Sequence, residues 1–195
     1  MPTIDKTAQD QLFFNARTHN AWQAKPVSDQ TLRDLFDLMK WAPTSANCSP
    51  LRVVFVKSAD AKAKLLACVA PGNVDKTKAA PVTAILAQDM QFHEQLPKLF
   101  PHADARSWYT GKDDLIRDTA FRNSSIQGGY FILAARALGL DCGPMSGFDA
   151  PALDKAFFSG TTFKANFLCN LGYGDAGKLF PRSPRFEFAE ACSII

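Results

Sequence analysis

The sequence predicts an α+β fold, with a central sheet of about four strands enclosed by helices. Short runs rich in β-branched and aromatic residues are separated by segments with helical spacing of apolar residues. The chain has 195 residues, of which 47% are hydrophobic and 21% charged. That is the composition of a globular domain large enough to bury a core without disulfides or a structural metal. We therefore expect a single domain over residues 1–195.

The first half of the chain contains clear helix and strand signals. Ser28 is a suitable N-cap, because apolar residues recur after it at helical spacing up to Met39, and Pro43 ends the pattern. The expected elements are, in order, a helix over 7–16, a helix from Ser28 to Pro43, a strand over 51–56, a helix over 58–70 that ends at Pro71-Gly72, a strand over 82–87, and an irregular or weakly helical segment over 97–111.

The longest periodic segment is a predicted helix over 113–138, with Gly139 as its C-terminal stop. It would be ~39 Å long, whereas a domain of this size has a radius of gyration of ~16 Å. Its inward stripe includes two amides, Asn123 and Gln127, and Gly128-Gly129 indicates close packing of another backbone, which suggests a second subunit. A strand over 167–171 follows, and the tail after Gly177 has little periodicity.

Composition excludes several classes of protein. A net charge of +3 and a pI of 8.6 are too mild for a nucleic-acid binder but suit anionic small molecules. The start of the sequence lacks the basic and apolar regions of a signal peptide, and no apolar run approaches a membrane span. The cysteines have no metal or redox spacing and are expected to be reduced, which predicts a soluble, cytoplasmic protein; they are Cys48, Cys68, Cys142, Cys169 and Cys192.

The common catalytic motifs are missing. Gly172-Tyr-Gly-Asp follows a predicted strand but lacks the third glycine and the helix of a dinucleotide site. The three histidines are too widely spaced for a metal template. Cys48 lies in a polar turn, but no histidine motif marks a base that would activate its thiol. We expect no protein nucleophile and no metal.

Four loop segments carry the candidate chemistry, and their order resembles that of the nitroreductase-like FMN flavoprotein superfamily. The segments are Arg17-Thr-His-Asn, Pro43-Thr-Ser-Ala-Asn-Cys-Ser-Pro, Gly143-Pro-Met-Ser-Gly-Phe-Asp after a predicted strand, and Pro181-Arg-Ser-Pro-Arg. The likeness is greatest to the branch that includes the malonic semialdehyde reductase of the Rut pyrimidine-degradation pathway. Further features of that branch are Ala16, Lys40-Trp41, Ala105-Arg-Ser-Trp, Phe121-Arg-Asn-Ser-Ser and Leu138-Gly-Leu-Asp.

The resemblance implies a mainly antiparallel sheet flanked by helices, and an interlocked homodimer with FMN at its interface. It also implies an NAD(P)H oxidoreductase that works by ping-pong hydride transfer, because the cofactor carries the chemistry. The branch suggests reduction of malonic semialdehyde to 3-hydroxypropanoate. The alternatives are a broad nitroaromatic or quinone reductase and, from another class, a flavin-binding carrier or sensor without turnover. The physiological substrate and the choice between NADH and NADPH stay open.

The resemblance also assigns cofactor-binding residues. Arg17, Arg182 and Arg185 would hold the phosphate, since arginine binds phosphate oxygens in pairs, although Pro184 leaves open which tail arginine reaches it. Asn73 and Lys76 would meet the flavin pyrimidine, with Lys78 as the competitor of Lys76. The remaining assignments are Thr18, His19 and Asn20 near the phosphate or ribityl chain; Pro144, Met145, Ser146 and Gly147 at the ring face and N5; Pro43, Thr44, Ser45 and Asn47 from the other subunit; and Arg106 as a carboxylate anchor for the substrate.

Overall fold

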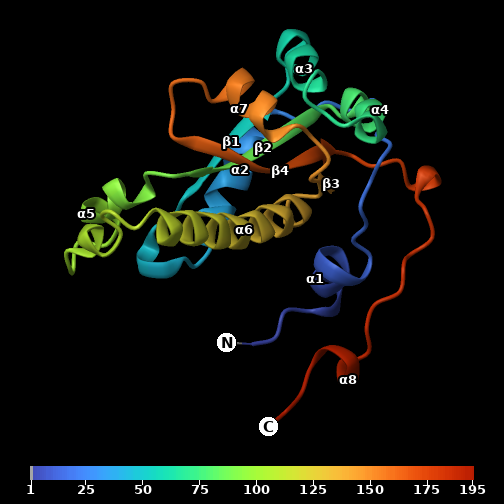
Figure 1. The fold of residues 1–195 in the computed structure, drawn as a ribbon. Coiled ribbons are helices and arrows are strands. Elements are labelled where there is room, and N and C mark those ends of the chain that lie inside the picture. The colour runs from blue at the N-terminus through green and yellow to red at the C-terminus, as the bar shows by residue number, and fades with distance from the viewer. Residues whose placement is uncertain (1) are drawn as a thin grey trace.

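The computed structural model describes residues 2–195 and places an antiparallel sheet between two layers of helices (Figure 1). The strands are β1 (Leu51–Val56), β2 (Val82–Asp89), β3 (Asp141–Met145) and β4 (Phe163–Gly172). Their order is β1-β2-β4-β3, and each neighbouring pair is antiparallel. The predicted α+β class and antiparallel sheet are confirmed, and β1 and β3 form the two edges.

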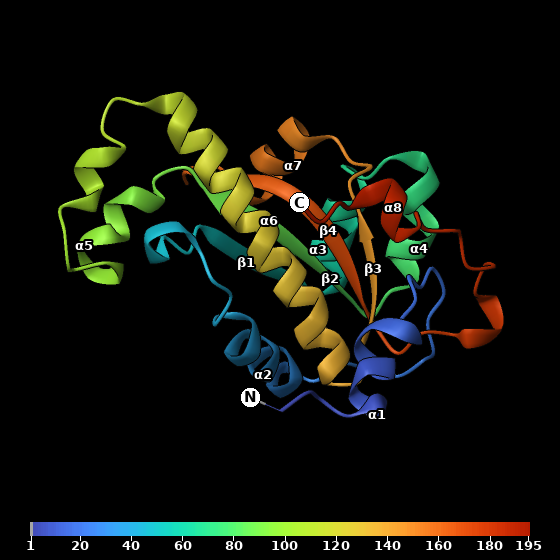
Figure 2. The ribbon, with the colours of Figure 1, turned by 90° about the horizontal axis from the view of Figure 1, so that it is seen from below.

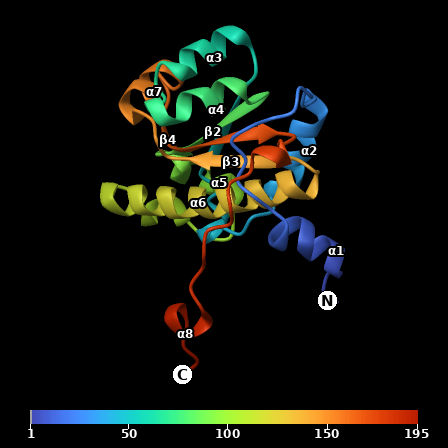
Figure 3. The same ribbon diagram turned by 90° about the vertical axis from the view of Figure 1, so that its right-hand side faces the viewer.

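The longer helices divide between the two faces of the sheet (Figures 1 and 3). One face is covered by α2 (Asp29–Met39) and α6 (Asp113–Ala137), and the other by α3 (Ala59–Leu66), α4 (Val74–Ala79) and α7 (Ala150–Phe157). Three short helices lie outside these layers: α1 (Lys6–Gln9), α5 (Leu96–Leu99) and α8 (Phe188–Ala191).

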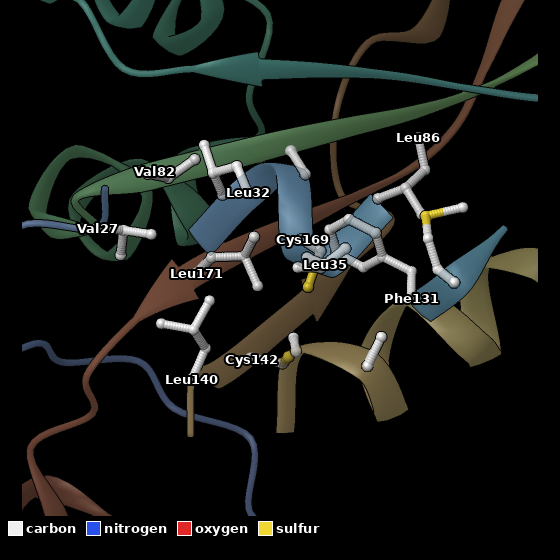
Figure 4. Packing of buried hydrophobic residues seen from close by; sticks show 14 of the residues in the cluster. Val27, Leu32, Leu35, Val82, Leu86, Phe131, Leu140, Cys142, Cys169 and Leu171 are labelled. Atoms are coloured by element: carbon white, nitrogen blue, oxygen red, sulfur yellow. The ribbon is translucent and has the colours of Figure 1, made fainter. Parts of the chain in front are cut away.

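Strand β2 lies at the centre of the core, and every one of its residues is buried. Side chains alternate along it because successive residues of a strand point to opposite faces. Leu86 points to one face and packs with residues of α2 and α6. Ile85, the residue before it, points to the other face and packs with residues of α3 and α7. Figure 4 shows the α6 side, where Phe131 and Leu35 lie beside Cys142 and Cys169. Both thiols are free and buried.

Helix α6 spans the subunit and ends at Ala137, just before the predicted stop at Gly139, whose φ is 74°. Its two central glycines differ in their surroundings. A Cβ on Gly128 would lie 2.6 Å from the ring of Phe167 in the same chain, so that glycine is explained without a partner. A Cβ on Gly129 would meet nothing within 4 Å, so only Gly129 leaves room for a second backbone.

Some boundaries differ from the predictions. The first helix is short, because α1 passes into a π-helical turn at Asp10–Phe14. Helix α3 ends at Leu66 rather than at residue 70. The Gly-Pro-Met segment lies inside β3 instead of after a strand. An edge strand tolerates proline there, because the missing N–H of Pro144 is not needed on the open side. Helix α7 was not predicted.

Residues 90–112 form an excursion beyond the sheet with its own small core. Phe92, Leu96 and Tyr109 pack there with Ile116 of α6 and with Cys48. The predicted irregular segment therefore consists of short helical turns fixed by aromatic packing. Within residues 2–195, no helix combines the length and apolar character needed to cross a membrane.

Candidate functional site

Two of the three candidate phosphate-binding arginines lie together and tie the tail to the first motif. Arg17 Nη2 donates to the carbonyl of Phe180 at 2.5 Å. Arg182 Nη2 donates in return to the carbonyls of Phe14 and Ala16, at 2.7 and 3.1 Å. Each guanidinium carries five N–H donors, so both retain donors for an anion.

Arg185 takes a different position from Arg182. Its Nη1 donates to the carbonyls of Ser183 and Pro184, at 3.1 and 2.9 Å, which are its own chain neighbours. The side chain is exposed, and the structure gives it no hydrogen bond to the first motif among residues 2–195. The structure thus places Arg182, rather than Arg185, next to the segment of Arg17.

His19 lies against strand β3, and the residue is only 6% exposed. Its backbone N–H donates to the carbonyl of Cys142 at 3.0 Å, and its Nε2 lies 3.4 Å from Oδ1 of Asp141. The other oxygen of Asp141 accepts from the N–H of Gly174 at 2.8 Å. The remaining ring nitrogen, Nδ1, is buried and has no hydrogen-bond partner within the described residues.

Gly174 makes this packing possible, because a Cβ there would lie 1.9 Å from Nδ1 of His19. Asp141 and Gly174 are thus supporting residues for His19 that the sequence reasoning missed. The only signal for Asp141 was its place in the Leu138-Gly-Leu-Asp segment. Because Nδ1 packs against Gly174 and is shielded from solvent, His19 fixes the first motif against β3 through its backbone and through Asp141.

Asn73 and Gly147 meet just after the C-terminal end of β3. Asn73 Nδ2 donates to the carbonyl of Gly147 at 3.0 Å, and the N–H of Ala70 donates to the same oxygen at 3.0 Å. A Cβ on Gly147 would lie 2.4 Å from Asn73 Nδ2, so the contact requires glycine. Pro144 and Ser146, on either side of Met145, are exposed and open to a ligand.

Helix α4 follows Asn73 and carries both lysine candidates. Lys76 is half-buried, and its backbone carbonyl accepts from Nε1 of Trp22 at 3.3 Å; Lys78 is exposed. Trp22 belongs to the chain just after the Arg17-Thr-His-Asn motif. The structure thus brings the first motif, the start of α4 and the β3 segment to one edge of the sheet.

The far end of α4 is held by Lys62, which the sequence reasoning also missed. Its ammonium donates to the carbonyls of Thr77 and Ala80, at 3.1 and 2.9 Å, and to Oγ1 of Thr83 at 3.1 Å. Burial lowers the pKa of Lys62 to about 8. The one sequence signal was its spacing of three from Leu65, a buried residue, on the same helix.

The Pro43–Pro50 turn lies apart from these residues. Ser45 N–H donates to Oδ1 of Asn123 at 2.9 Å, and Asn47 Nδ2 donates to the carbonyl of Leu99 at 2.9 Å. Ala46, Asn47 and Ser49 have φ values of 49°, 51° and 38°. A residue other than glycine in this left-handed region costs about 1–2 kcal/mol.

Helix α6 gives the scale of that separation. Asn123 holds the turn from near the middle of α6, whereas Arg136, in the last turn, donates to the carbonyl of Leu12 at 2.9 Å. Residues 123 and 136 are ~20 Å apart along an α-helix at 1.5 Å per residue. Figure 2 shows the same arrangement, with the α2–β1 connection beside α5 and with α1 at the opposite end of α6. One chain therefore does not bring the turn to the arginines.

Arg106 is already paired. Its Nε and Nη2 donate to the two carboxylate oxygens of Glu94, at 2.7 and 3.0 Å. This pairing raises the pKa of Arg106 and lowers that of Glu94. A substrate carboxylate would have to compete with Glu94 for the same fork of donors.

Cys48 is unsuited to act as a nucleophile. The side chain is fully buried, and burial raises the pKa of its thiol to about 11. The thiolate is the reactive form of cysteine, so this thiol is inert at neutral pH. No cluster of three or more metal-ligating side chains occurs within residues 2–195.

The comparisons with known proteins settle the family. The model of the nitroreductase family matches residues 15–173. This chain belongs to the nitroreductase family. A relative from Burkholderia lata is 64% identical over 194 residues, with all of both chains covered, and is named provisionally as an NADH dehydrogenase/NAD(P)H nitroreductase. One from Rhodopseudomonas palustris, with the same provisional name, is 63% identical and covers 99% of this chain and 98% of its own.

Solved structures of nitroreductases share the fold. One from Bacillus subtilis has a TM-score of 0.89 at 23% identity and covers 98% of this chain and 100% of its own. One from Exiguobacterium sibiricum, provisionally named a nitroreductase and solved in complex with FMN, has a TM-score of 0.87 at 17% identity. It covers 100% of this chain and 99% of its own. The nitroreductase-like fold expected from the sequence is therefore confirmed.

Proposed function

We propose that this nitroreductase-family protein is an FMN-dependent NAD(P)H oxidoreductase. The observation that carries the proposal is that Arg17 and Arg182 hold each other's segments beside the strand bridge of Thr18 to Cys142, while Asn73 lies at the same edge of the sheet against Gly147. This donor set suits a ligand with an anionic phosphate at one end and a hydrogen-bonding planar ring at the other. The names of the relatives support NAD(P)H as the donor, and the FMN complex of a structural neighbour supports the cofactor.

The phosphate end is where the donors are strongest. Arg17 and Arg182 would bind the phosphate with the donors they do not use on backbone carbonyls, since charge-assisted pairs are the strongest hydrogen bonds in proteins. His19, with Thr18 and Asn20 beside it, would lie near the phosphate or the ribityl chain. Arg185 would lie at the edge of the phosphate-binding site.

The flavin ring would lie along β3. Asn73 and Lys76 would meet its pyrimidine edge, and the backbone of Ser146–Gly147 would face N5, with Pro144 and Met145 along the ring face. When bound, FMN accepts hydride from NAD(P)H and passes it to the substrate. A cation at Lys76 would favour negative charge at that edge, and the residues of β3 would shield one face of the ring from water.

We also propose a homodimer in which the second subunit supplies Pro43, Thr44, Ser45 and Asn47. The placing of the turn supports this arrangement, because Asn123 holds it ~20 Å along α6 from Arg136, the residue that contacts the segment before the first motif. The tail supports it as well. Every residue from 180 to 195 is exposed, Phe186 by 80%, and the tail runs away from the sheet to α8 (Figure 3). Several large apolar side chains exposed together indicate a surface that another protein chain covers.

As the substrate we propose malonic semialdehyde, on the resemblance to its reductases. Its aldehyde carbon would receive the hydride and its oxygen a proton from water, which gives 3-hydroxypropanoate. NAD(P)H and the aldehyde would use the same exposed ring face in turn, which predicts ping-pong kinetics.

The second candidate is a nitroaromatic or quinone reductase. The names of the relatives favour it, and so does the ion pair of Arg106 with Glu94, which leaves no free carboxylate anchor at that position. A flavin carrier or sensor without turnover is the candidate from another class, and no observation favours it.

Steady-state kinetics at saturating FMN test the proposal. Malonic semialdehyde, a nitrofuran and a quinone are compared with NADH and with NADPH, and protein without FMN serves as the blank. We expect FMN-dependent turnover with the semialdehyde as the preferred acceptor. Rapid reduction of the nitrofuran alone would assign the second candidate, and no turnover with any acceptor would favour the carrier.

A further inference from the structure

The Pro43–Pro50 turn holds a conformation that its own residues disfavour. Ala46, Asn47 and Ser49 all have φ in the left-handed region, and none is glycine. Such a turn keeps its shape only when its surroundings fix it. The turn also carries Ser45 and Asn47, both exposed, which are the residues assigned to the flavin of the other subunit.

Four side-chain hydrogen bonds within residues 2–195 fix the turn. Thr44 Oγ1 accepts from the N–H of Ser49 at 3.1 Å, and Asn47 Nδ2 donates to the carbonyl of Leu99 at 2.9 Å. Both of those side chains belong to the turn itself. The other two bonds come from outside the turn. Arg52 Nη1 donates to the carbonyl of Ser49 at 3.0 Å, next to β1, and Asn123 Oδ1 accepts from the N–H of Ser45 at 2.9 Å. Only the bond from Asn123 reaches the Ser45 end of the turn.

Asn123 is built as an anchor. Its side chain is 1% exposed and leaves α6 on the face that points into the protein. Its Nδ2 donates to the carbonyl of Thr119, one helical turn earlier, at 2.9 Å, which fixes the orientation of the amide. The oxygen is thereby presented to Ser45 by a rigid helix.

Gln127 provides an internal comparison on the same helix. Its Oε1 accepts from the N–H of Leu51 at 2.9 Å, and its side chain is 4% exposed. The two amides, one helical turn apart, thus hold the two ends of the same connection. Leu51 belongs to β1 and is also held by pairing with β2, whereas Ser45 has no strand beside it.

We propose that Asn123 is a positioning residue for the cofactor site, which sets Ser45 and Asn47 of one subunit against the flavin bound by the other. The inference rests on the proposed FMN-binding dimer. Asn123 does not touch the cofactor: it acts through the backbone of Ser45, and its removal lets the strained turn relax away from the flavin.

The test compares FMN dissociation constants of the full-length protein and its variants. Asn123→Ala removes the acceptor, and Asn123→Ser keeps a hydroxyl that can donate to Thr119 but is too short to reach Ser45. A buried hydrogen bond of this kind corresponds to about a tenfold change, so we expect the FMN dissociation constant to rise ~10-fold in both variants. Gln127→Ala is the matched control and should change it by about twofold or less.

A rescue separates positioning from general damage. Glycine adopts left-handed φ without strain, so Ala46→Gly in the Asn123→Ala background should restore most of the FMN affinity. The visible circular dichroism of bound flavin should change in Asn123→Ala and return in the double variant. Far-ultraviolet circular dichroism and the mass of the dimer show whether each variant is folded. If Asn123→Ala does not fold, the FMN dissociation constant of Asn123→Ser provides the test.

The outcomes are distinct. Wild-type protein that binds no FMN overturns the proposed function and this inference together. Wild-type binding with equal losses in the Asn123 and Gln127 variants overturns only the inference, because Asn123 would then be merely structural. Wild-type affinity in both Asn123 variants overturns it as well.

Discussion

Arg17 and Arg182 each hold the chain segment that carries the other. Arg17 donates to the carbonyl of Phe180, and Arg182 donates to those of Phe14 and Ala16. Both are thereby positioned before any ligand arrives, so an anion between them would be bound by preorganised donors. Preorganisation lowers the entropy lost when the ligand binds.

The first prediction concerns this pair. Arg17→Ala or Arg182→Ala should raise the FMN dissociation constant by ~10- to 100-fold, because each charge-assisted hydrogen bond to phosphate is worth about 1.5–3 kcal/mol. Titration of apo protein with FMN measures the change. Arg185→Ala is the comparison and should have a small effect, since Arg185 bonds only to its own neighbours. Unchanged affinity in Arg17→Ala would remove this residue from the site.

Rates measured at saturating FMN show whether the same variants also change the reactivity of the bound flavin. The flavin ring would still be held by Asn73, Lys76 and the β3 segment, so the reductive half-reaction of loaded Arg17→Ala should change little. A large loss of rate in fully loaded protein would show that Arg17 acts on the ring and not on the phosphate.

The tail should be required for the dimer. Removal of residues 183–195 keeps Arg182 but deletes Phe186 and Phe188, which are exposed in the single chain. Burial of each phenylalanine contributes about 1.5–3 kcal/mol, so the dimer dissociation constant should rise ~100-fold or more. Sedimentation equilibrium measures it, and FMN affinity should fall in parallel. A truncated protein that stays dimeric at wild-type strength would show that the tail is not part of the interface.

Lys62 should make stability depend on pH. Its pKa is about 8 in the folded protein, against an ordinary value of 10.5, because of burial. Between these values the unfolded chain binds the proton that the folded protein has lost, so the free energy of unfolding rises with pH in this window. At about 1.4 kcal/mol per pKa unit the upper bound is roughly 3 kcal/mol, and because solvent still reaches Lys62 we expect a rise of about half that or less.

Urea unfolding of wild type and Lys62→Met across this pH range isolates the effect, because methionine keeps most of the chain length without the charge. The difference in the free energy of unfolding between the two proteins should change in favour of wild type from about pH 8 to 10.5. A difference that stays flat with pH would contradict the burial of a charged amine at Lys62.

The cysteines should differ sharply in reactivity. Cys192 is exposed in the subunit, whereas the other four are buried, and burial raises the pKa of Cys48 to about 11. Alkylation of the native protein at neutral pH, followed by peptide mass analysis, should label Cys192 before any other. Cys48→Ala should retain turnover. Rapid labelling of Cys48 with loss of turnover would instead assign it a catalytic role.

Local patterns in the sequence were sufficient for much of the fold. The runs at β1 and β2, the cap at Ser28 and the stop at Gly139 each depend on neighbouring residues, and each was predicted. Strand β3 was not bounded correctly, because its glycine and proline are typical of a loop and only its place at the sheet edge admits them.

The site was predictable only through resemblance. Arg17 and Phe180 are far apart in the sequence, and no local pattern indicates that they meet. Asn123 was visible as a polar residue in an apolar stripe, but its partner Ser45 depends on how the turn folds back onto α6. Lysine is typical of protein surfaces, and apart from the spacing of Lys62 from Leu65 only the three acceptors around its ammonium, which the fold brings together, distinguish it.

Anaerobic titration of the FMN-loaded protein with NADH and with NADPH tests the central claim most directly. The protein should bind FMN and turn yellow, and its visible flavin absorbance should disappear as one molecule of donor is consumed per bound flavin. The colour should return when an acceptor substrate is added. A protein that takes up no FMN, or one whose bound flavin stays oxidised with both donors, would contradict the assignment as an FMN-dependent NAD(P)H oxidoreductase.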